Sequence, residues 1–196
     1  MRSKLVLVSL LFAIAAVPTK AQSLNVAKHG DKAVLFSFQG LSTLDLGQYQ
    51  GGFGAKYFVS DGVAMRGMLL FGLDNTTTAA SGLSPETTQN TLSVGIDGGL
   101  EYHMPLASSI SPYVGGTVMF ENGKTTYNPG ANTSGSTIFG AGAIGGIEYF
   151  FNQNISLSAE YQFGVSDEIR TASGSPNQSE LKVGFQTAGL TLAAYF

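Results

Sequence analysis

Six charged residues stand out as the groups most able to do chemistry in this chain, because they fall on the same side of alternating segments. We expect the two bases and four acids to form an ion-pair network in an enclosed space, since a charge removed from water needs a partner. Such a network can act as a gate or a proton path, or it can fill the interior as a plug, which is the role we expect. The six residues are Lys56, Arg66, Asp97, Glu101, Glu148 and Glu160.

Histidine could act as a general base beside a serine nucleophile, provided that the two side chains are held in contact. The chain has only His29 and His103, and it has no Cys. Both histidines map to the periplasmic end of the expected strands, whereas a lipid substrate would lie in the outer leaflet. His103 also lacks an obvious Ser in register, since Ser108 and Ser109 follow it in a turn. We therefore expect two solvated turn histidines and no catalytic residue.

A glycine-rich segment, Gly140-Ala141-Gly142-Ala143-Ile144-Gly145, matches the dinucleotide fingerprint G-x-G-x-x-G. That fingerprint needs a preceding strand and a following helix. Here a loop rich in Ser and Thr precedes the segment, and an alternating strand pattern continues to Phe150. We therefore expect a narrow glycine-lined wall, and no nucleotide or other cofactor.

The elements that must position these residues are alternating segments separated by turn-rich stretches. Most have one apolar face with a period of two residues. Most are also close to the roughly 9–11 residues that a tilted membrane-spanning strand needs. We expect eight strands, at about 32–40, 49–59, 63–73, 91–102, 112–121, 137–150, 155–165 and 180–196.

The placement of charge distinguishes a membrane barrel from a soluble one. In the second to seventh segments the apolar face carries no charge, and the charged residues share the other face with Gly, Ser and Thr. A charge facing lipid at mid-membrane costs about 2–4 kcal/mol, whereas a lumen position tolerates it. We therefore predict an all-β fold, an eight-stranded antiparallel up-and-down transmembrane β-barrel, whose interior is just wide enough for side chains to fill.

Connector lengths support this prediction, because spanning barrels have short periplasmic turns and longer outer loops. The connectors at 74–90, 122–136 and 166–179 are long and rich in Thr, Ser, Asn and Gly, whereas 60–62 and 152–154 are tight turns. The connector at 103–111 is an exception, since it is as long as the first outer loop.

The N-terminus predicts export. Arg2 and Lys4 precede an apolar run at 5–17, and small residues follow at Thr19 and Ala21, which is typical of a secretory signal. We expect a signal peptide at 1–21 and a barrel domain at 22–196. The net charge of −3 offers no basic face for nucleic acid. The absence of Cys excludes disulfides and thiolate metal sites.

The chain ends Ala188-Gly189-Leu190-Thr191-Leu192-Ala193-Ala194-Tyr195-Phe196, and this ending resembles the C-terminal signal of bacterial outer-membrane barrels. Ser111-Pro112-Tyr113-Val114-Gly115-Gly116 and Gly145-Gly146-Ile147-Glu148-Tyr149 resemble strands of the opacity-like surface barrels, relatives in shape of the outer-membrane protein A and protein X barrels. The resemblance implies that Phe196 is an assembly signal, read by the barrel-assembly machinery, with periplasmic chaperones as further partners.

These features predict a protein of the outer membrane, surrounded by its lipid after export through the inner membrane. Our first hypothesis is a non-enzymatic surface barrel with a structural role or an adhesion role through its extracellular loops, which could contact a host or surface ligand. The alternatives are a narrow channel for ions or small solutes, a lipid-modifying barrel enzyme and a secreted soluble barrel.

Overall fold

The computed structural model of the chain describes residues 27–39, 48–80, 86–104, 109–128, 133–172 and 175–196. The predicted signal peptide lies outside these ranges and stays a prediction. No helix among the described residues is long and apolar enough to cross a membrane.

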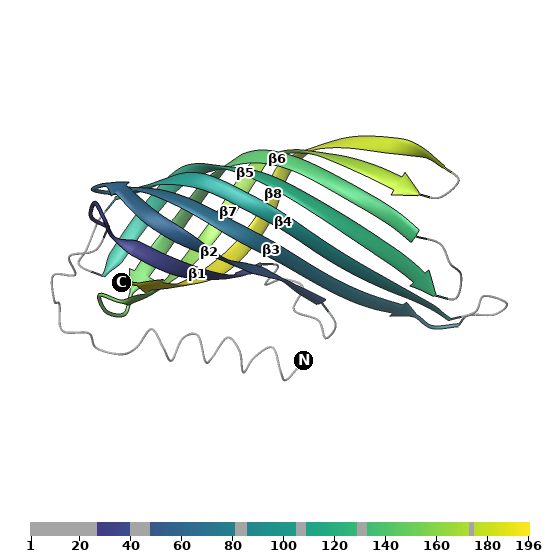
Figure 1. Cartoon of the computed structure of the whole chain (residues 1–196), viewed down its shortest axis with the longest axis horizontal. Coiled ribbons are helices and arrows are strands. Elements are labelled where there is room, and N and C mark those ends of the chain that lie inside the picture. The colour runs from purple at the N-terminus through teal and green to yellow at the C-terminus, as the bar shows by residue number, and fades with distance from the viewer. Residues whose placement is uncertain (1–26, 40–47, 81–85, 105–108, 129–132, 173–174) are drawn as a thin grey trace.

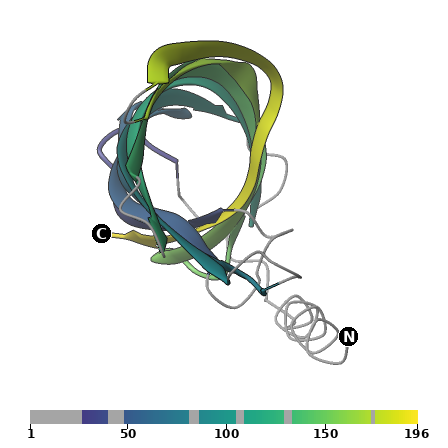
Figure 2. The same cartoon turned by 90° about the vertical axis from the view of Figure 1, so that its right-hand side faces the viewer.

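Eight antiparallel strands form one closed barrel in which each strand pairs with its neighbours in the sequence (Figure 1). The first and last strands close the ring, from Ala33 opposite Tyr195 to Gln39 opposite Gly189 (Figure 2). The predicted fold class is therefore confirmed. The strands are β1 (Lys32–Gln39), β2 (Gln48–Ser60), β3 (Val63–Thr78), β4 (Thr87–His103), β5 (Ile110–Asn128), β6 (Thr133–Phe150), β7 (Ile155–Ala172) and β8 (Ser175–Tyr195).

The outward faces of the strands form a continuous apolar belt. Side chains alternate between exposed and buried, so that Ile96 is 55% exposed whereas the adjacent Asp97 is 8% exposed. Five consecutive strands each present an uncharged outward face about eleven residues long, as a tilted spanning strand requires. These faces lie at 63–73, 92–102, 110–120, 139–149 and 155–165.

The strands continue beyond this belt at one end of the barrel, which corrects three of the expected loops. The hairpins β3–β4, β5–β6 and β7–β8 extend far into 74–90, 122–136 and 166–179 (Figure 1). Polar outward side chains bond across these extensions, as Asn75 does to Asn90 (2.5 Å) and Asn122 to Thr137 (3.1 Å). The end of the apolar pattern therefore marks the edge of the membrane, and the strands end later.

The opposite end of the barrel carries tight turns, as the connector lengths predict. Gly62 has a φ of +75° in the turn between β2 and β3, a conformation that favours glycine. In the turn between β6 and β7, the side chain of Asn152 accepts hydrogen bonds from the backbone nitrogens of Asn154 (2.8 Å) and Ile155 (3.0 Å). Residues 105–108 of the unusually long connector fall outside the described ranges.

Candidate functional site

The barrel interior holds a compact charged cluster in the half nearest the tight turns. Five strands contribute to it, because alternate residues of each strand point inward. β2 supplies Lys56, β3 supplies Arg66, and the carboxylates come from β4, β6 and β7. All six residues proposed from the sequence for a lumen network lie in this cluster: Lys56, Arg66, Asp97, Glu101, Glu148 and Glu160.

Lys56 and Arg66 are direct cross-strand partners in β2 and β3. Like charges opposite each other are destabilising, so an anion must bridge them. Glu101 does so, with one carboxylate oxygen 2.9 Å from the Lys56 ammonium and the other 3.1 Å from Arg66 Nη1. Because the side chains of Lys56 and Glu101 are 4% and 1% exposed, solvent screens this bridge little.

Arg66 also reaches across the lumen to β7, where its guanidinium binds the two oxygens of Glu160 at 2.5 and 2.9 Å. This bidentate geometry is the strongest form of an arginine–carboxylate pair. Arg66 Nε lies 3.5 Å from an oxygen of Asp97, and neither atom has a hydrogen-bond partner among the described residues.

Hydroxyl groups complete the coordination of the carboxylates. Glu148 pairs with Lys56 at 3.2 Å and accepts hydrogen bonds from the hydroxyls of Ser156 and Tyr195. Tyr113 donates to Glu160 at 2.8 Å, and Thr117 donates to Asp97. Two cations can therefore serve four carboxylates, because neutral donors satisfy most of the remaining oxygens.

His103 corrects our expectation of a solvated turn histidine, because its side chain is fully buried. Its Nε2 lies 2.9 Å from Glu101, and its Nδ1 lies 3.2 Å from the hydroxyl of Ser111. The sequence predicted no serine partner for His103, but the β4–β5 register brings Ser111 to its level. His103 pairs with Tyr113 in that register, and the local sequence pattern gave no sign of the contact with Ser111.

The arrangement of Ser111, His103 and Glu101 has the connectivity of a catalytic triad, but it is closed to substrate in the described structure. Ser111 is 4% exposed, and the ring of His103 is packed between Phe58 and Tyr113, with centroid distances of 5.1 and 4.9 Å. Glu101 is also neutralised by two cations. His29 is exposed, and its backbone N–H donates a hydrogen bond to the Asp61 carboxylate at 2.9 Å.

Aromatic side chains close the space below the charges. Phe58 and Phe150 are almost completely buried, and each packs against Tyr195 at centroid distances of 6.4 and 5.6 Å. The ammonium of Lys56 lies 5.5 Å from the Tyr113 ring centroid, within the range of a cation–π contact. Charged side chains and aromatic rings together fill this part of the lumen.

The glycine-rich segment at 140–145 lies inside β6, with no helix after it, so it lacks the setting of a nucleotide-binding loop. The next glycine, Gly146, has a structural task. A Cβ at this position would lie 2.5 Å from the Tyr113 ring and 2.6 Å from its hydroxyl. Gly146 therefore leaves the space that lets Tyr113 reach Glu160.

A second charged group lies at the opposite mouth of the barrel, beyond the apolar belt. Glu168 bonds to Arg170 at 2.7 Å and to Lys182 at 2.5 Å, which joins β7 to β8. The hydrogen bonds from Arg170, together with the one from Lys182, lower the pKa of the Glu168 carboxyl to about 2. Among the described residues, no cluster of His, Cys, Asp and Glu is suited to a metal ion.

A closed antiparallel barrel with an apolar outer belt and a charged interior defines a transmembrane β-barrel. In agreement, the sequence matches the family described as "Outer membrane protein beta-barrel domain" over residues 6–196, and the chain belongs to this family. It is a protein of the outer membrane, with lipid around its belt. No curated protein matches the chain in sequence.

Two solved structures are similar to the chain in fold. Outer membrane protein OprG from Pseudomonas aeruginosa is 12% identical, with a TM-score of 0.52 and coverage of 86% of this chain and 97% of that one. The N-terminal β-barrel domain of OprF, also from Pseudomonas aeruginosa, is 15% identical, with a TM-score of 0.50 and coverage of 86% and 98%. At these identities the likeness concerns the fold alone.

Proposed function

We propose that this protein is a non-enzymatic, non-conducting surface barrel that stabilises the outer membrane and contacts partners through its extracellular hairpins. The observation that carries the proposal is the filled lumen. Ion pairs that span from β3 to β7 lie above a floor of aromatic rings, and both layers are nearly inaccessible to solvent. A barrel of eight strands has little room left for a pore once side chains occupy it.

Two features support a role in contact with partners over a role in catalysis. The hairpins continue past the belt as paired strands, so they present polar side chains on a rigid support. The buried position of Ser111 and His103, in contrast, gives a lipid or other substrate no route to the serine. A rigid, polar and exposed surface suits the binding of a host or surface ligand.

The alternative function, a narrow channel for ions or small solutes, is tested by planar-bilayer recordings. We expect the wild-type barrel to show no discrete single-channel openings, whereas Arg66→Ala, which removes the link across the lumen, should produce them. Stable openings of the wild type would favour the channel. Mass analysis of lipid A from cells with and without the protein tests enzymatic activity, and we expect identical lipid A in both.

A further inference from the structure

Lys124 is an exposed cation on the outward face of β5, on the lipid-facing side of the wall. The outward residues before it on β5, from Ile110 to Phe120, are uncharged and belong to the apolar belt. No carboxylate pairs with Lys124 among the residues that the structure describes. An exposed lysine without an internal partner at this place is available to an external anion.

The height of Lys124 corresponds to the headgroup layer of the outer leaflet. It follows Phe120 by four residues, which is about 13 Å along a strand. With a strand tilt of about 35–45°, its Cα lies about 10 Å above Phe120, the last apolar residue of β5, and directly opposite Leu92 at the upper edge of the belt on β4. A lysine side chain can extend or bend back over several ångströms from there, so its ammonium can reach the phosphates of that layer.

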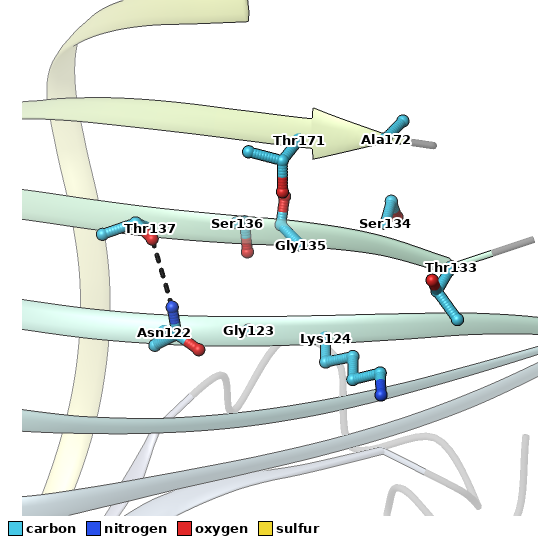
Figure 3. A pocket seen from close by; sticks show the side chains of 10 residues that line it. All are labelled: Asn122, Gly123, Lys124, Thr133, Ser134, Gly135, Ser136, Thr137, Thr171 and Ala172. Atoms are coloured by element: carbon cyan, nitrogen blue, oxygen red, sulfur yellow. Dashed lines mark hydrogen bonds between the residues drawn. The ribbon is translucent and has the colours of Figure 1, made fainter. Parts of the chain in front are cut away.

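Two hollows meet at Lys124. One has a volume of about 470 Å³ and is lined by hydroxyl and amide groups, among them Asn122, Thr133, Thr137 and Thr171 (Figure 3). Asn122 bonds to Thr137 there, and the Lys124 side chain extends from the same strand (Figure 3). Lys124 lies at the edge of this hollow (Figure 3), and hydroxyl and amide groups beside one cation suit a ligand that carries both an anion and sugar hydroxyls.

The second hollow, of about 520 Å³, lies on the other side of Lys124 and combines apolar with polar walls. Leu73 and Leu92 belong to the upper edge of the belt, while Asn75, Asn90 and Thr126 lie beyond it. Asp74 also lines this hollow, but it belongs to the lumen face of β3 and accepts a hydrogen bond from Thr76 at 2.9 Å. The lining of this hollow therefore changes from apolar to polar in the same direction in which a membrane lipid changes from acyl chain to headgroup.

We propose that Lys124 binds a phosphate of a phosphorylated glycolipid in the outer leaflet. In this site the ammonium donates to the phosphate, the amides and hydroxyls beside it bond to the sugar, and Leu73 and Leu92 contact the first acyl carbons. Lysine commonly binds phosphate as a point charge, and a cation near a membrane surface adds to the affinity for anionic lipid. The site lies on the lipid-facing wall and does not depend on the proposed function.

Lys32 provides a matched control, because it is also an exposed lysine on an outward strand face. It lies at the end of β1 nearest the tight turns, and neither of the hollows at Lys124 includes it. If positive charge alone attracted the lipid, loss of either lysine would weaken binding equally. If the hollows at Lys124 form a binding site, only the loss of Lys124 would weaken it. Both are at the surface, so neither substitution to Gln removes a buried contact.

The test measures binding of bisphosphorylated lipid A to the full chain, refolded in zwitterionic detergent, by native mass spectrometry. Lys124→Gln should weaken the apparent affinity about fivefold, the contribution of one lysine near an anionic surface. Lys124→Arg and Lys32→Gln should both bind as the wild type does. Heat-modifiable migration on gels verifies that every variant is folded.

Two further ligands identify the chemistry of the site. Lipid A without its phosphates should bind wild type and Lys124→Gln equally, and phosphatidylglycerol should bind the wild type more weakly than lipid A does. Unchanged lipid A binding by Lys124→Gln would overturn the proposal, as would an equal loss in Lys32→Gln. Equal binding of phosphatidylglycerol and lipid A would overturn the assignment to a glycolipid.

Discussion

At the scale of single residues, the lumen is organised by two cations that share four carboxylates. Lys56 and Arg66 stand side by side, and Glu101 between them removes their repulsion. Burying charges costs desolvation energy that their attraction repays only with good geometry. The hydroxyls of Tyr113, Tyr195 and the neighbouring serine and threonine supply that geometry, so the cluster can be buried without leaving most of its oxygens unpaired.

Arg66→Ala should strongly destabilise the barrel, because it leaves Glu160 and Asp97 without a cation in a nearly inaccessible interior. Removal of one partner of a buried pair costs about 3–5 kcal/mol. Arg170→Ala is the control, since the Arg170 side chain is 52% exposed and exposed pairs contribute about 0–1 kcal/mol. Urea unfolding in lipid vesicles measures both variants. Similar losses would contradict a special role for the lumen pair.

Gly146→Ala should destabilise the barrel by about 1–3 kcal/mol, the usual cost of overpacking an interior. The added methyl would meet the Tyr113 ring at 2.5 Å and displace its hydroxyl from Glu160. Gly145 provides the neighbouring control, because its Cβ would meet nothing within 4 Å. The same unfolding assay should find Gly145→Ala close to wild type, and a larger loss there would refute this account of the glycine.

At the scale of the strands, each element has a membrane part and an outer part with different side chains on its outward face. The membrane part of β4 presents Leu92, Val94 and Ile96, whereas its outer part presents Asn90 and Thr88. Threonine is well suited to strands because its branched side chain fits the pleated surface. Cross-strand bonds such as Thr77 to Thr88 (3.4 Å) then support pairing where lipid no longer covers the wall.

Ile96→Arg should impair folding into bilayers, because Ile96 is 55% exposed in the middle of the belt. An arginine there costs about 2–4 kcal/mol. Ser93→Arg on the inward face of the same strand should have a much smaller effect, provided that the lumen can accommodate the longer side chain. The folded fraction after refolding into vesicles tests both variants, and equal losses would be inconsistent with the assignment of the two faces.

The outer ends of β7 and β8 should lose stability in acid. The bonds of Glu168 to Arg170 and Lys182 lower its pKa to about 2, below the value of about 4.3 in an unfolded chain. The stabilisation is thus present above pH 4.3 and is lost as the pH falls through 2. Carboxyl NMR titration should find this low pKa in the wild type and a higher one in Lys182→Gln. An unchanged value in the variant would exclude this cause.

At the scale of the whole molecule, the pairing of β1 with β8 closes the ring and does not include Phe196. β8 ends at Tyr195, whereas Phe196 is 77% exposed and only its backbone nitrogen bonds to Lys32, at 3.0 Å. A side chain with so little contact contributes little to the folded state. We therefore propose that its resemblance to the C-terminal signal of outer-membrane barrels concerns assembly.

Deletion of Phe196 should leave refolding into synthetic vesicles nearly unchanged and sharply lower the amount of folded barrel in the outer membrane of cells. On this proposal the two effects differ because the barrel-assembly machinery reads Phe196 only on the cellular route. Urea midpoints in vitro and outer-membrane fractionation in vivo measure the two effects. Normal outer-membrane levels of the truncated protein would contradict the proposed role of Phe196.

The sequence by itself determined the class of fold and the face on which each strand residue lies. Alternation with a period of two residues is a local property of a strand, so Ile96 could be assigned outward and Asp97 inward from the pattern alone. The uncharged face identified the membrane belt for the same reason. The pattern stops at the edge of the lipid, however, and so it placed the ends of the outer hairpins too early.

Only the tertiary structure decided which inward residues meet. Arg66 and Glu160 are 94 positions apart and lie on β3 and β7, so their contact depends on closure of the ring and on the registers of all the strands between them. The contact of His103 with Ser111 depends likewise on the β4–β5 register. A period of two residues specifies the face of a side chain but not its height relative to another strand, and height is what brings these partners together.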